Sequence, residues 1–271
     1  MIQGLLAHAG VELRTGVRDR TLLLMTYLFP LGFYGFMGVF MTEMNPQFVT
    51  VMVPGMAVFA MLAAAMFGLP EPLLSARATG VLRSYRINGV PTGAVFGVPV
   101  VTTVVHLLLV GAIIAATAPV LFDASPVAAG PYVFVLVVAG VAHTALGALI
   151  GVVSANSRIA VLWSQLLFLP SVLLAGIIVP LEHVPELFRP LSLLLPATYA
   201  MEAFTGMAMG AATTVPPWAA VGFLASGAVA ALVLTRLCYA WDDHGAGRRR
   251  RSSFGVLAIA PYAVGAIAYG I

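Results

Sequence analysis

Residues 131–153 read PYVFVLVVAGVAHTALGALIGVV and contain no charged side chain. An α-helix rises about 1.5 Å per residue, so this stretch is long enough to cross the roughly 30 Å hydrocarbon layer of a bilayer. Further uncharged runs of similar length lie on both sides of it. Because backbone polar groups inside a bilayer must be paired within the chain, such runs predict transmembrane helices.

The overall composition agrees with this interpretation. Of the 271 residues, 61% are hydrophobic and 8% are charged, against roughly 25% charged residues in soluble domains. We therefore expect an all-α integral membrane protein with six transmembrane helices. The expected spans are residues 21–41, 48–69, 92–119, 131–153, 159–179 and 218–240.

The segments between and around the spans have a different pattern. Residues 1–20 place apolar side chains at helical spacing and predict an amphipathic helix in the membrane interface. Residues 71–91 carry three arginines, yet Leu74, Ala78, Val81, Leu82 and Tyr85 recur at helical spacing, which predicts a short amphipathic helix. Residues 180–217 mix charged residues with prolines and predict short helices that dip into the interface.

The C-terminal region leaves its own membrane placement open. It contains the basic run Arg248 to Arg251, followed by an apolar stretch at 254–271 that could span, re-enter or lie on the surface. The expected organisation is thus an interfacial helix (1–20), a six-span transmembrane domain (21–240), and a basic cytoplasmic segment with an apolar helix (241–271).

The arginines predict the orientation, because positively charged loops stay on the cytoplasmic side. With six spans and a cytoplasmic N-terminus, twelve of the thirteen arginines lie inside and only Arg189 lies outside. We therefore expect a multi-pass protein of the inner (plasma) membrane whose 71–91 segment is cytoplasmic and whose 180–217 segment is external. A basic set made only of arginine, with abundant Ala, Gly and Val, is typical of a GC-rich bacterial genome.

Residues that the chain lacks exclude several mechanisms. It has no lysine, so it can form neither a Walker A phosphate loop nor a pyridoxal Schiff base. Cys238 is the only cysteine, which excludes an intrachain disulfide and a multi-cysteine metal site. Glu182, His183 and Glu186 do not have the spacing of a zinc motif. We expect a chain that binds no cofactor, metal or nucleic acid and has no ATPase site of its own.

Two segments carry motifs that are specific when taken together. The first is LPEPLLSARATGVLRSYRINGVPTG at 69–93, an arginine-rich stretch with a Thr-Gly step followed by a proline turn. The second is LAGIIVPLEHVPELFRPLSLLLPATYAMEAFTGMAMG at 174–210. In it Gly176 and Pro180 end the fifth span, Pro185 lies between short helices, and Pro196, Thr198 and Tyr199 form a Pro-x-Thr-Tyr step before Glu202.

In this order and spacing, the two segments resemble the membrane subunits of type-2 ATP-binding-cassette (ABC-2) exporters, over roughly residues 1–240. The resemblance implies a coupling helix that contacts a separate ATPase subunit, formed here by Arg77, Thr79, Gly80, Val81, Leu82, Arg83, Tyr85 and Arg86. It also implies a re-entrant or exit region containing Pro196, Tyr199 and Glu202. ATP and Mg²⁺ would be bound by the partner ATPase.

The resemblance further implies that two membrane subunits, identical or related, line a path between their second and fifth spans. The candidate path residues are Phe59, Met66, Phe67, Leu167, Phe168 and Val172. Met and Phe make adaptable apolar walls, although ordinary helix packing or lipid contact explains each residue at least as well. Such walls favour export of an amphipathic or hydrophobic drug, natural product or lipid-like molecule, as in multidrug efflux and antibiotic resistance.

Two other function classes remain open from the sequence. A secondary transporter or channel would also be polytopic and could also lack lysine. An intramembrane hydrolase would need a nucleophile at membrane depth, but none of the candidate serines lies in a Gly-x-Ser-x-Gly motif. His106 and His143 lie inside spans, where an ionisable group suggests either a functional site or a neutral hydrogen bond to a neighbouring helix.

Overall fold

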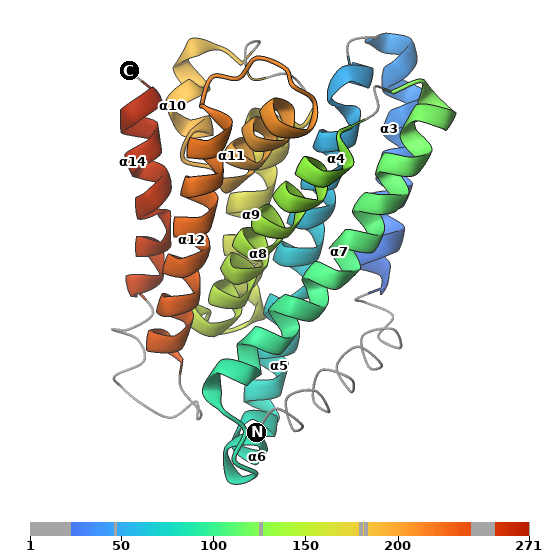
Figure 1. Ribbon diagram of the computed structural model, residues 1–271. Coiled ribbons are helices and arrows are strands. Elements are labelled where there is room, and N and C mark those ends of the chain that lie inside the picture. Colours follow the sequence, from blue (N-terminus) through green and yellow to red (C-terminus); the bar gives the residue numbers. More distant parts are fainter. Residues whose placement is uncertain are drawn as a thin grey trace.

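The computed structural model describes residues 23–45, 48–124, 127–178, 181, 184–239 and 253–270. Within these ranges every regular element is a helix (Figure 1). Six helical stretches are long and apolar enough to cross a membrane: Leu24–Met44, Phe48–Ala78, Thr92–Phe122, Ala129–Val153, Ser157–Leu174 and Pro217–Cys238. The predicted all-α membrane architecture with six spans is confirmed. The interfacial helix predicted at 1–20, Pro180, Glu182, His183 and the basic run at 248–251 lie outside the described residues.

The first two spans are built from several consecutive helical segments. The first span joins the π-helical turn η1 (Leu24–Leu28) to α3 (Phe29–Met44). The second joins α4 (Phe48–Ala63), the π-helical turn η2 (Ala64–Gly68) and α5 (Pro70–Ala78). Each remaining span is one helix: α7 (Thr92–Phe122), α8 (Ala129–Val153), α9 (Ser157–Leu174) and α12 (Pro217–Cys238).

Helix α8 lies at the centre of the bundle because small residues let its neighbours approach closely. A Cβ atom on Gly147 would collide with the carbonyl oxygen of Ala65, so η2 packs backbone to backbone against α8. A Cβ atom on Gly151 would lie 3.1 Å from the Cα atom of Pro70, at the start of α5. Lipid tails are as apolar as leucine, so close packing of this kind is what holds membrane helices together.

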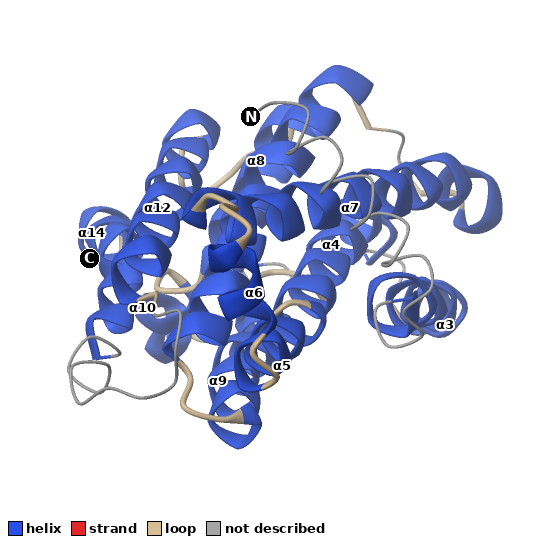
Figure 2. Cartoon of the chain, turned by 90° about the horizontal axis from the view of Figure 1, so that it is seen from below, coloured by secondary structure: helices blue, strands red, loops and turns tan. Residues whose placement is uncertain are grey.

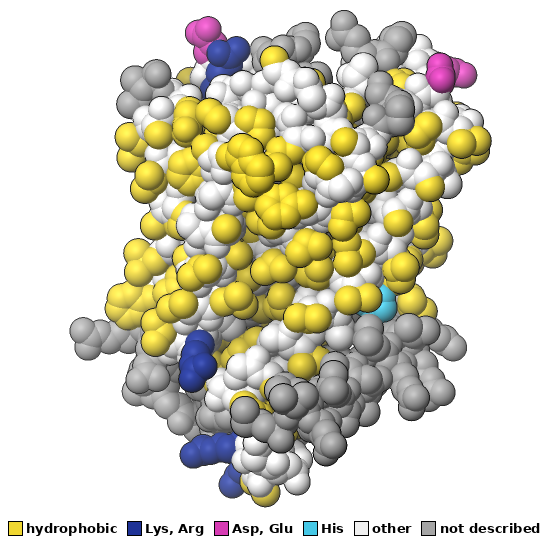
Figure 3. Space-filling view, in the orientation of Figure 1, with side chains coloured by type: hydrophobic (Ala, Val, Ile, Leu, Met, Phe, Trp, Pro, Cys, Tyr) yellow, Lys and Arg dark blue, Asp and Glu magenta, His cyan; other side chains and the backbone are white. Residues whose placement is uncertain are grey.

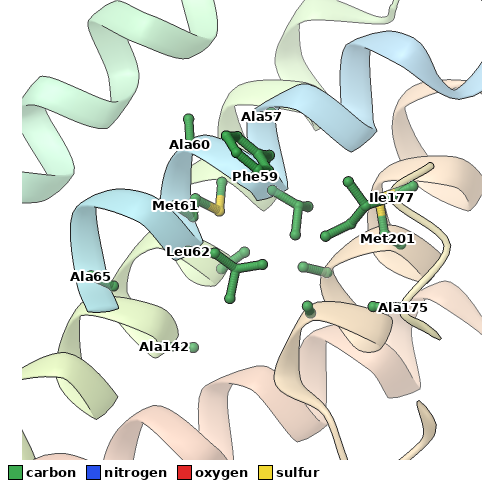
Figure 4. Packing of buried hydrophobic residues seen from close by; sticks show 14 of the residues in the cluster. Ala57, Phe59, Ala60, Met61, Leu62, Ala65, Ala142, Ala175, Ile177 and Met201 are labelled. Carbon is green, nitrogen blue, oxygen red and sulfur yellow. The ribbon is translucent and has the colours of Figure 1, made fainter. Parts of the chain in front are cut away.

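Helix α4 is the other buried element. Its side chains form one core cluster with residues of α8, of α11 (Pro196–Ala203) and of the segment that follows α9. Figure 4 shows Met61 and Leu62 of α4 in this cluster, together with Ala142 of α8, Ile177 and Met201. The second span is therefore held by protein on most of its circumference, whereas α9 leaves most of its surface exposed.

The segment at 71–91, predicted as one cytoplasmic amphipathic helix, is divided in two. Its first part, α5, continues the second span, and its second part is the separate helix α6 (Val81–Ile87). Gly80 separates them with φ 77°, a left-handed conformation that glycine adopts without steric cost. The break also changes the predicted apolar face, because Leu74 and Leu82 are buried while Ala78 and Val81 are exposed.

The described residues between the fifth and sixth spans contain four short helical segments, in agreement with the short helices predicted there. They are η4 (Glu186–Phe188), α10 (Arg189–Ser192), α11 and the π-helical turn η5 (Phe204–Ala208). The fifth span ends at Leu174 rather than Val179, and Gly176 follows in a left-handed conformation with φ 87°. Helices α6 and α11 lie near opposite ends of the bundle, which we call the α6 end and the α11 end (Figure 1).

The C-terminal apolar stretch packs beside α12 as η6 (Ser253–Ile259), a 3₁₀ helix, followed by α14 (Ala260–Tyr269). Seen along the bundle, α14 and α3 occupy opposite sides of the molecule (Figure 2).

Candidate functional site

Helix α6 projects from the α6 end and is anchored by one buried side chain. Leu82 is 3% exposed and packs in a small cluster with Leu73 of α5 and with Val95 and Phe96 of α7. Tyr85 is half-buried against the same cluster. The remaining side chains of α6 are exposed: Val81, Arg83, Ser84, Arg86 and Ile87. Of the predicted coupling residues on α6, two therefore attach the helix to the bundle, namely Leu82 and Tyr85. The other three are exposed at the surface: Val81, Arg83 and Arg86.

Arg77 connects α5 to the turn between the fourth and fifth spans. Its Nη1 donates to the carbonyl oxygen of Val152 at 3.1 Å, and its Nη2 donates to that of Ser154 at 2.8 Å. These carbonyls lie at the C-terminal end of α8, where the helix leaves acceptors unpaired and a positive charge is favourable. On the same side, the Ser157 hydroxyl donates to Glu71 Oε1 at 3.1 Å. The α5 helix is therefore fastened to the beginning of α9.

Phenylalanines join the second span to the fifth. The ring centroids of Phe67 and Phe168 lie 4.8 Å apart, and those of Phe59 and Phe168 lie 5.7 Å apart. Both separations are typical of favourable aromatic pairs. Leu167 and Val172 of α9 are half-buried against the same core. The structure thus brings the predicted path residues of the two spans together within one subunit.

The π-helical turn η2 adds a polar contact at the same junction. The Ser164 hydroxyl of α9 donates to the carbonyl oxygen of Met66 at 2.7 Å, and Met66 is 2% exposed. A π-turn interrupts the regular helical hydrogen bonds, so its carbonyls need other donors in an apolar environment. The Ser164 hydroxyl supplies one such donor, and this hydrogen bond fixes the position of the second span along the fifth.

At the α11 end, the Pro-x-Thr-Tyr step folds back onto the turn before it. Pro196 lies in the first turn of α11, where a proline costs no hydrogen bond. The Thr198 hydroxyl donates to the carbonyl oxygen of Ser192, and the Tyr199 hydroxyl lies 2.7 Å from that of Leu193. Tyr199 is fully buried, and every residue of α11 is buried with it. These side chains hold the α10–α11 turn together.

Glu202 fixes the loop that leads to the sixth span. Its Oε2 accepts a hydrogen bond from the backbone N–H of Val215 at 2.6 Å, and the residue is 6% exposed. Burial is the largest influence and raises the pKa of Glu202, while hydrogen bonds from the backbone of Val215 and Thr214 lower it. The residue is placed to order the loop between η5 and α12.

Charged residues lie at the two ends of the bundle, and most of the described arginines lie at one of them. Among the arginines that the structure describes, all but Arg189 lie at the α6 end: Arg77, Arg83, Arg86, Arg158 and Arg236. Figure 3 shows an apolar belt with basic side chains below it and with both acidic and basic side chains above it. This is the surface expected of a protein that crosses a bilayer.

Comparison with known proteins agrees with this geometry. The family model described as ABC-2 type transporter matches residues 9–209. The chain belongs to the ABC-2 type transporter family. No curated protein and no solved structure matches it significantly.

Membership makes this multi-pass membrane protein an ABC-2 permease, the transport subunit of an ABC transporter. In general, such a permease works with an ABC ATPase and a second membrane subunit. The family match ends at residue 209, so α12 and α14 follow the matched region.

Some contacts of this ABC-2 permease were not anticipated from the sequence. Phe33 of the first span stacks on Phe59 with centroids 4.0 Å apart, and Phe29 lies 5.4 Å from the same ring. The spacing of Phe29 and Phe33, four residues apart on one helix face, is the signal that could have indicated them. The first span therefore borders the same aromatic cluster as the second and the fifth.

The two histidines inside spans of the permease make one hydrogen bond between helices and one within a helix. His106 Nδ1 lies 2.6 Å from the Tyr27 hydroxyl and joins α7 to η1. His143 Nδ1 lies 2.8 Å from the carbonyl oxygen of Ala139 on its own helix. In the part of the chain that the structure describes, no three His, Cys, Asp or Glu side chains form a group that could hold a metal ion.

Proposed function

We propose that this ABC-2 permease is the membrane subunit of an ATP-driven exporter, which moves an amphipathic or hydrophobic molecule out of the cell. A separate ATPase subunit binds ATP and Mg²⁺ and docks on α6. A second membrane subunit, either another copy of this chain or a related chain, completes the path. The observation that carries the proposal is a short, exposed basic helix that follows directly on the second span.

The distribution of charge supports a cytoplasmic position for the α6 end. Arg83 and Arg86 lie on α6, and Arg158 and Arg236 lie at the same end of the bundle. Since positively charged segments stay on the cytoplasmic side, α6 faces the compartment that contains ATP. In this orientation the α11 end faces outward and the chain is a multi-pass protein of the inner (plasma) membrane, with its N-terminus in the cytoplasm.

The contacts around α5 support a mechanism of coupling. Leu82 anchors α6 to α5 and α7, and α5 leads through η2 into α4. Arg77 and Glu71 link the same helix to the α8–α9 turn. A displacement of α6 by the ATPase therefore acts on the second and fifth spans together, and it changes the contact of Phe59 and Phe67 with Phe168. Gating of this kind is how lids and levers control many transport and catalytic cycles.

The chemistry of the path supports an apolar or amphipathic substrate. Phenylalanines dominate the contact between the second and fifth spans, and α9 presents Leu162, Leu166, Leu169 and Leu173 outward. A wall of this kind offers apolar surface and aromatic faces but few polar partners. A drug, a natural product or a lipid-like molecule has the matching chemistry, consistent with multidrug efflux or self-resistance to an antibiotic.

The test is co-expression of the permease with candidate ATPase subunits, followed by co-purification. The variant Arg83→Glu/Arg86→Glu reverses two exposed charges on α6 and removes no buried contact. We expect it to reduce co-purified ATPase at least tenfold while the unfolding temperature of the permease is unchanged. Arg236→Glu, an exposed arginine at the same end on α12, is the matched control and should retain the ATPase. Undiminished assembly and ATP-dependent transport in the double variant would refute docking at α6.

A further inference from the structure

The C-terminal helices η6 and α14 lack the charges of an ordinary cytoplasmic tail. No residue from Ser252 to Ile271 is charged. The pair packs along α12, and α14 runs beside it toward the α11 end (Figure 1). The outward side chains are also apolar, with Val256 and Leu257 each 55% exposed, Val264 59% and Ile267 69% exposed. A helix that is apolar on both its packed and its outer side is typical of a lipid environment.

The two ends of this segment contact opposite ends of the bundle. A Cβ atom on Gly255 would lie 3.1 Å from Val153 Cγ1, at the C-terminal end of α8 beside the Ser154 carbonyl that binds Arg77. A Cβ atom on Gly270 would lie 3.3 Å from Leu193 Cδ1, in the turn before α11. The segment therefore extends from the α6 end to the α11 end.

The length agrees with a complete crossing. An α-helix of ten residues rises about 15 Å, which is half of the roughly 30 Å hydrocarbon layer. The seven residues of η6 form a 3₁₀ helix, and at about 2.0 Å per residue they add roughly 14 Å. Because η6 is a 3₁₀ helix, η6 and α14 together are about as long as the hydrocarbon layer is thick. Pro261, in the first turn of α14, lies where the helix changes type.

Two tyrosines pack the C-terminal segment against α11 and α12. Tyr262 is fully buried, and a Cβ atom on Gly227 of α12 would collide with its ring. The Tyr199 hydroxyl lies 3.2 Å from the carbonyl oxygen of Tyr262, and a Cβ atom on Gly265 would collide with that hydroxyl. The glycines allow α14 to approach both α12 and α11 closely. The helix is therefore in contact with the motif tyrosine of α11 as well as with the sixth span.

We propose that residues 253–270 form a seventh membrane crossing that braces α11 through Tyr199. The crossing places Gly270 on the opposite side of the membrane from α6. The sequence before it fits this direction, since Arg248 to Arg251 precede the apolar stretch and basic residues stay on the side of the other arginines. The crossing depends on neither the substrate nor the direction of transport.

The topology is tested by labelling cysteines with a membrane-impermeant maleimide, in a Cys238→Ala background. A Gly-Ser spacer ending in cysteine is attached after Ile271. Ile87→Cys reports the α6 side and Leu187→Cys the α11 side, because both positions are highly exposed. We expect the attached cysteine and Leu187→Cys to be labelled from one side of sealed vesicles, and Ile87→Cys only from the other. Labelling of the attached cysteine from the same side as Ile87→Cys would overturn the seventh crossing.

The brace is tested by the unfolding temperature of the full chain in detergent. Tyr262→Ala removes the buried ring, whereas the matched control Val264→Ala shortens an exposed side chain on the same helix. We expect Tyr262→Ala to lower the unfolding temperature by several degrees and Val264→Ala to leave it unchanged. Equal unfolding temperatures for the two variants would refute the brace. Neither this readout nor the labelling requires transport, so a failure of the proposed function is distinguishable from a failure of this inference.

Discussion

Helices α6 and α11 both lie in segments that carry motifs of an ABC-2 permease, but they differ in how far they are buried. On α6, Leu82 is buried and most other side chains are exposed. On α11, all eight residues are buried. Helix α6 projects from one end of the bundle, whereas α11 lies among α4, α8, α12 and α14.

This contrast indicates that the two motifs have different roles: one is suited to binding a partner, and the other maintains the fold. Exposed arginines on a short helix contribute little to the stability of the chain that carries them, so they are suited to contacts with a partner. Tyr199 and Glu202 bind the backbone of their own chain, at the Leu193 carbonyl and the Val215 N–H, so they maintain the fold. Substitutions should therefore affect assembly at α6 and stability at α11.

Tyr199→Ala should have the largest effect on stability. Truncation of a buried aromatic side chain typically costs about 3–5 kcal/mol, because a cavity remains where the ring was. The loss of contacts with Leu193 and Tyr262 adds to it. We expect a large fall in the unfolding temperature of the purified permease in detergent.

Two controls sharpen this prediction. Tyr199→Phe keeps the ring and removes only the hydroxyl, which in membrane proteins is worth about 0.6 kcal/mol per hydrogen bond on average. Ile87→Ala on α6 shortens a side chain that is 77% exposed and should leave the unfolding temperature unchanged. If Tyr199→Ala is no less stable than Ile87→Ala, the contrast between the two ends is wrong.

Arg77→Ala should have an intermediate effect, because Arg77 lies in the α6 segment but binds within the chain. Hydrogen bonds from a charged donor are worth about 1.5–3 kcal/mol when buried, and partial exposure of Arg77 lowers this to about 1–2 kcal/mol. We expect a moderate fall in unfolding temperature, retained co-purification of the ATPase, and reduced ATP-dependent transport.

Arg77→Lys should fall between the wild type and Arg77→Ala, since an ammonium group lacks the planar fork that reaches both carbonyls. Loss of ATPase binding in Arg77→Ala, to the same extent as in Arg83→Glu/Arg86→Glu, would show that Arg77 belongs to the docking surface instead.

The spans were predictable because hydropathy and length suffice for them. The predicted 131–153 and 218–240 lie within two residues of α8 and α12. Hydropathy does not show whether a side chain faces lipid or another helix, because both surroundings are apolar. Helices α4 and α9 therefore both qualify as spans by sequence, although α4 is almost wholly buried and α9 is mostly exposed.

Contacts between distant residues explain the remaining differences. Arg77 was grouped with Arg83 and Arg86 by its position in the motif, but its acceptors at Val152 and Ser154 lie more than seventy residues away. The π-turn at Met66 and its donor Ser164 leave no periodic signal in the sequence. The break at Gly80 is different, since a glycine after a threonine is a recognisable helix end.

Glu202→Gln should have the smallest effect, and its sign depends on pH. Burial raises the pKa of the folded Glu202 carboxyl above its ordinary value of 4.5, so the folded chain retains this proton at pH values where the unfolded chain has lost it. Between the unfolded and the folded pKa of Glu202, the stability of the wild type falls as pH rises. The glutamine of the variant keeps an oxygen acceptor for the Val215 N–H and does not titrate. We therefore expect the unfolding temperature of the wild type, measured relative to the Glu202→Gln variant, to rise as pH is lowered toward 4.5. A difference that is independent of pH, or that falls on acidification, would mean that the hydrogen bonds from Val215 and Thr214 outweigh the burial of the carboxylate.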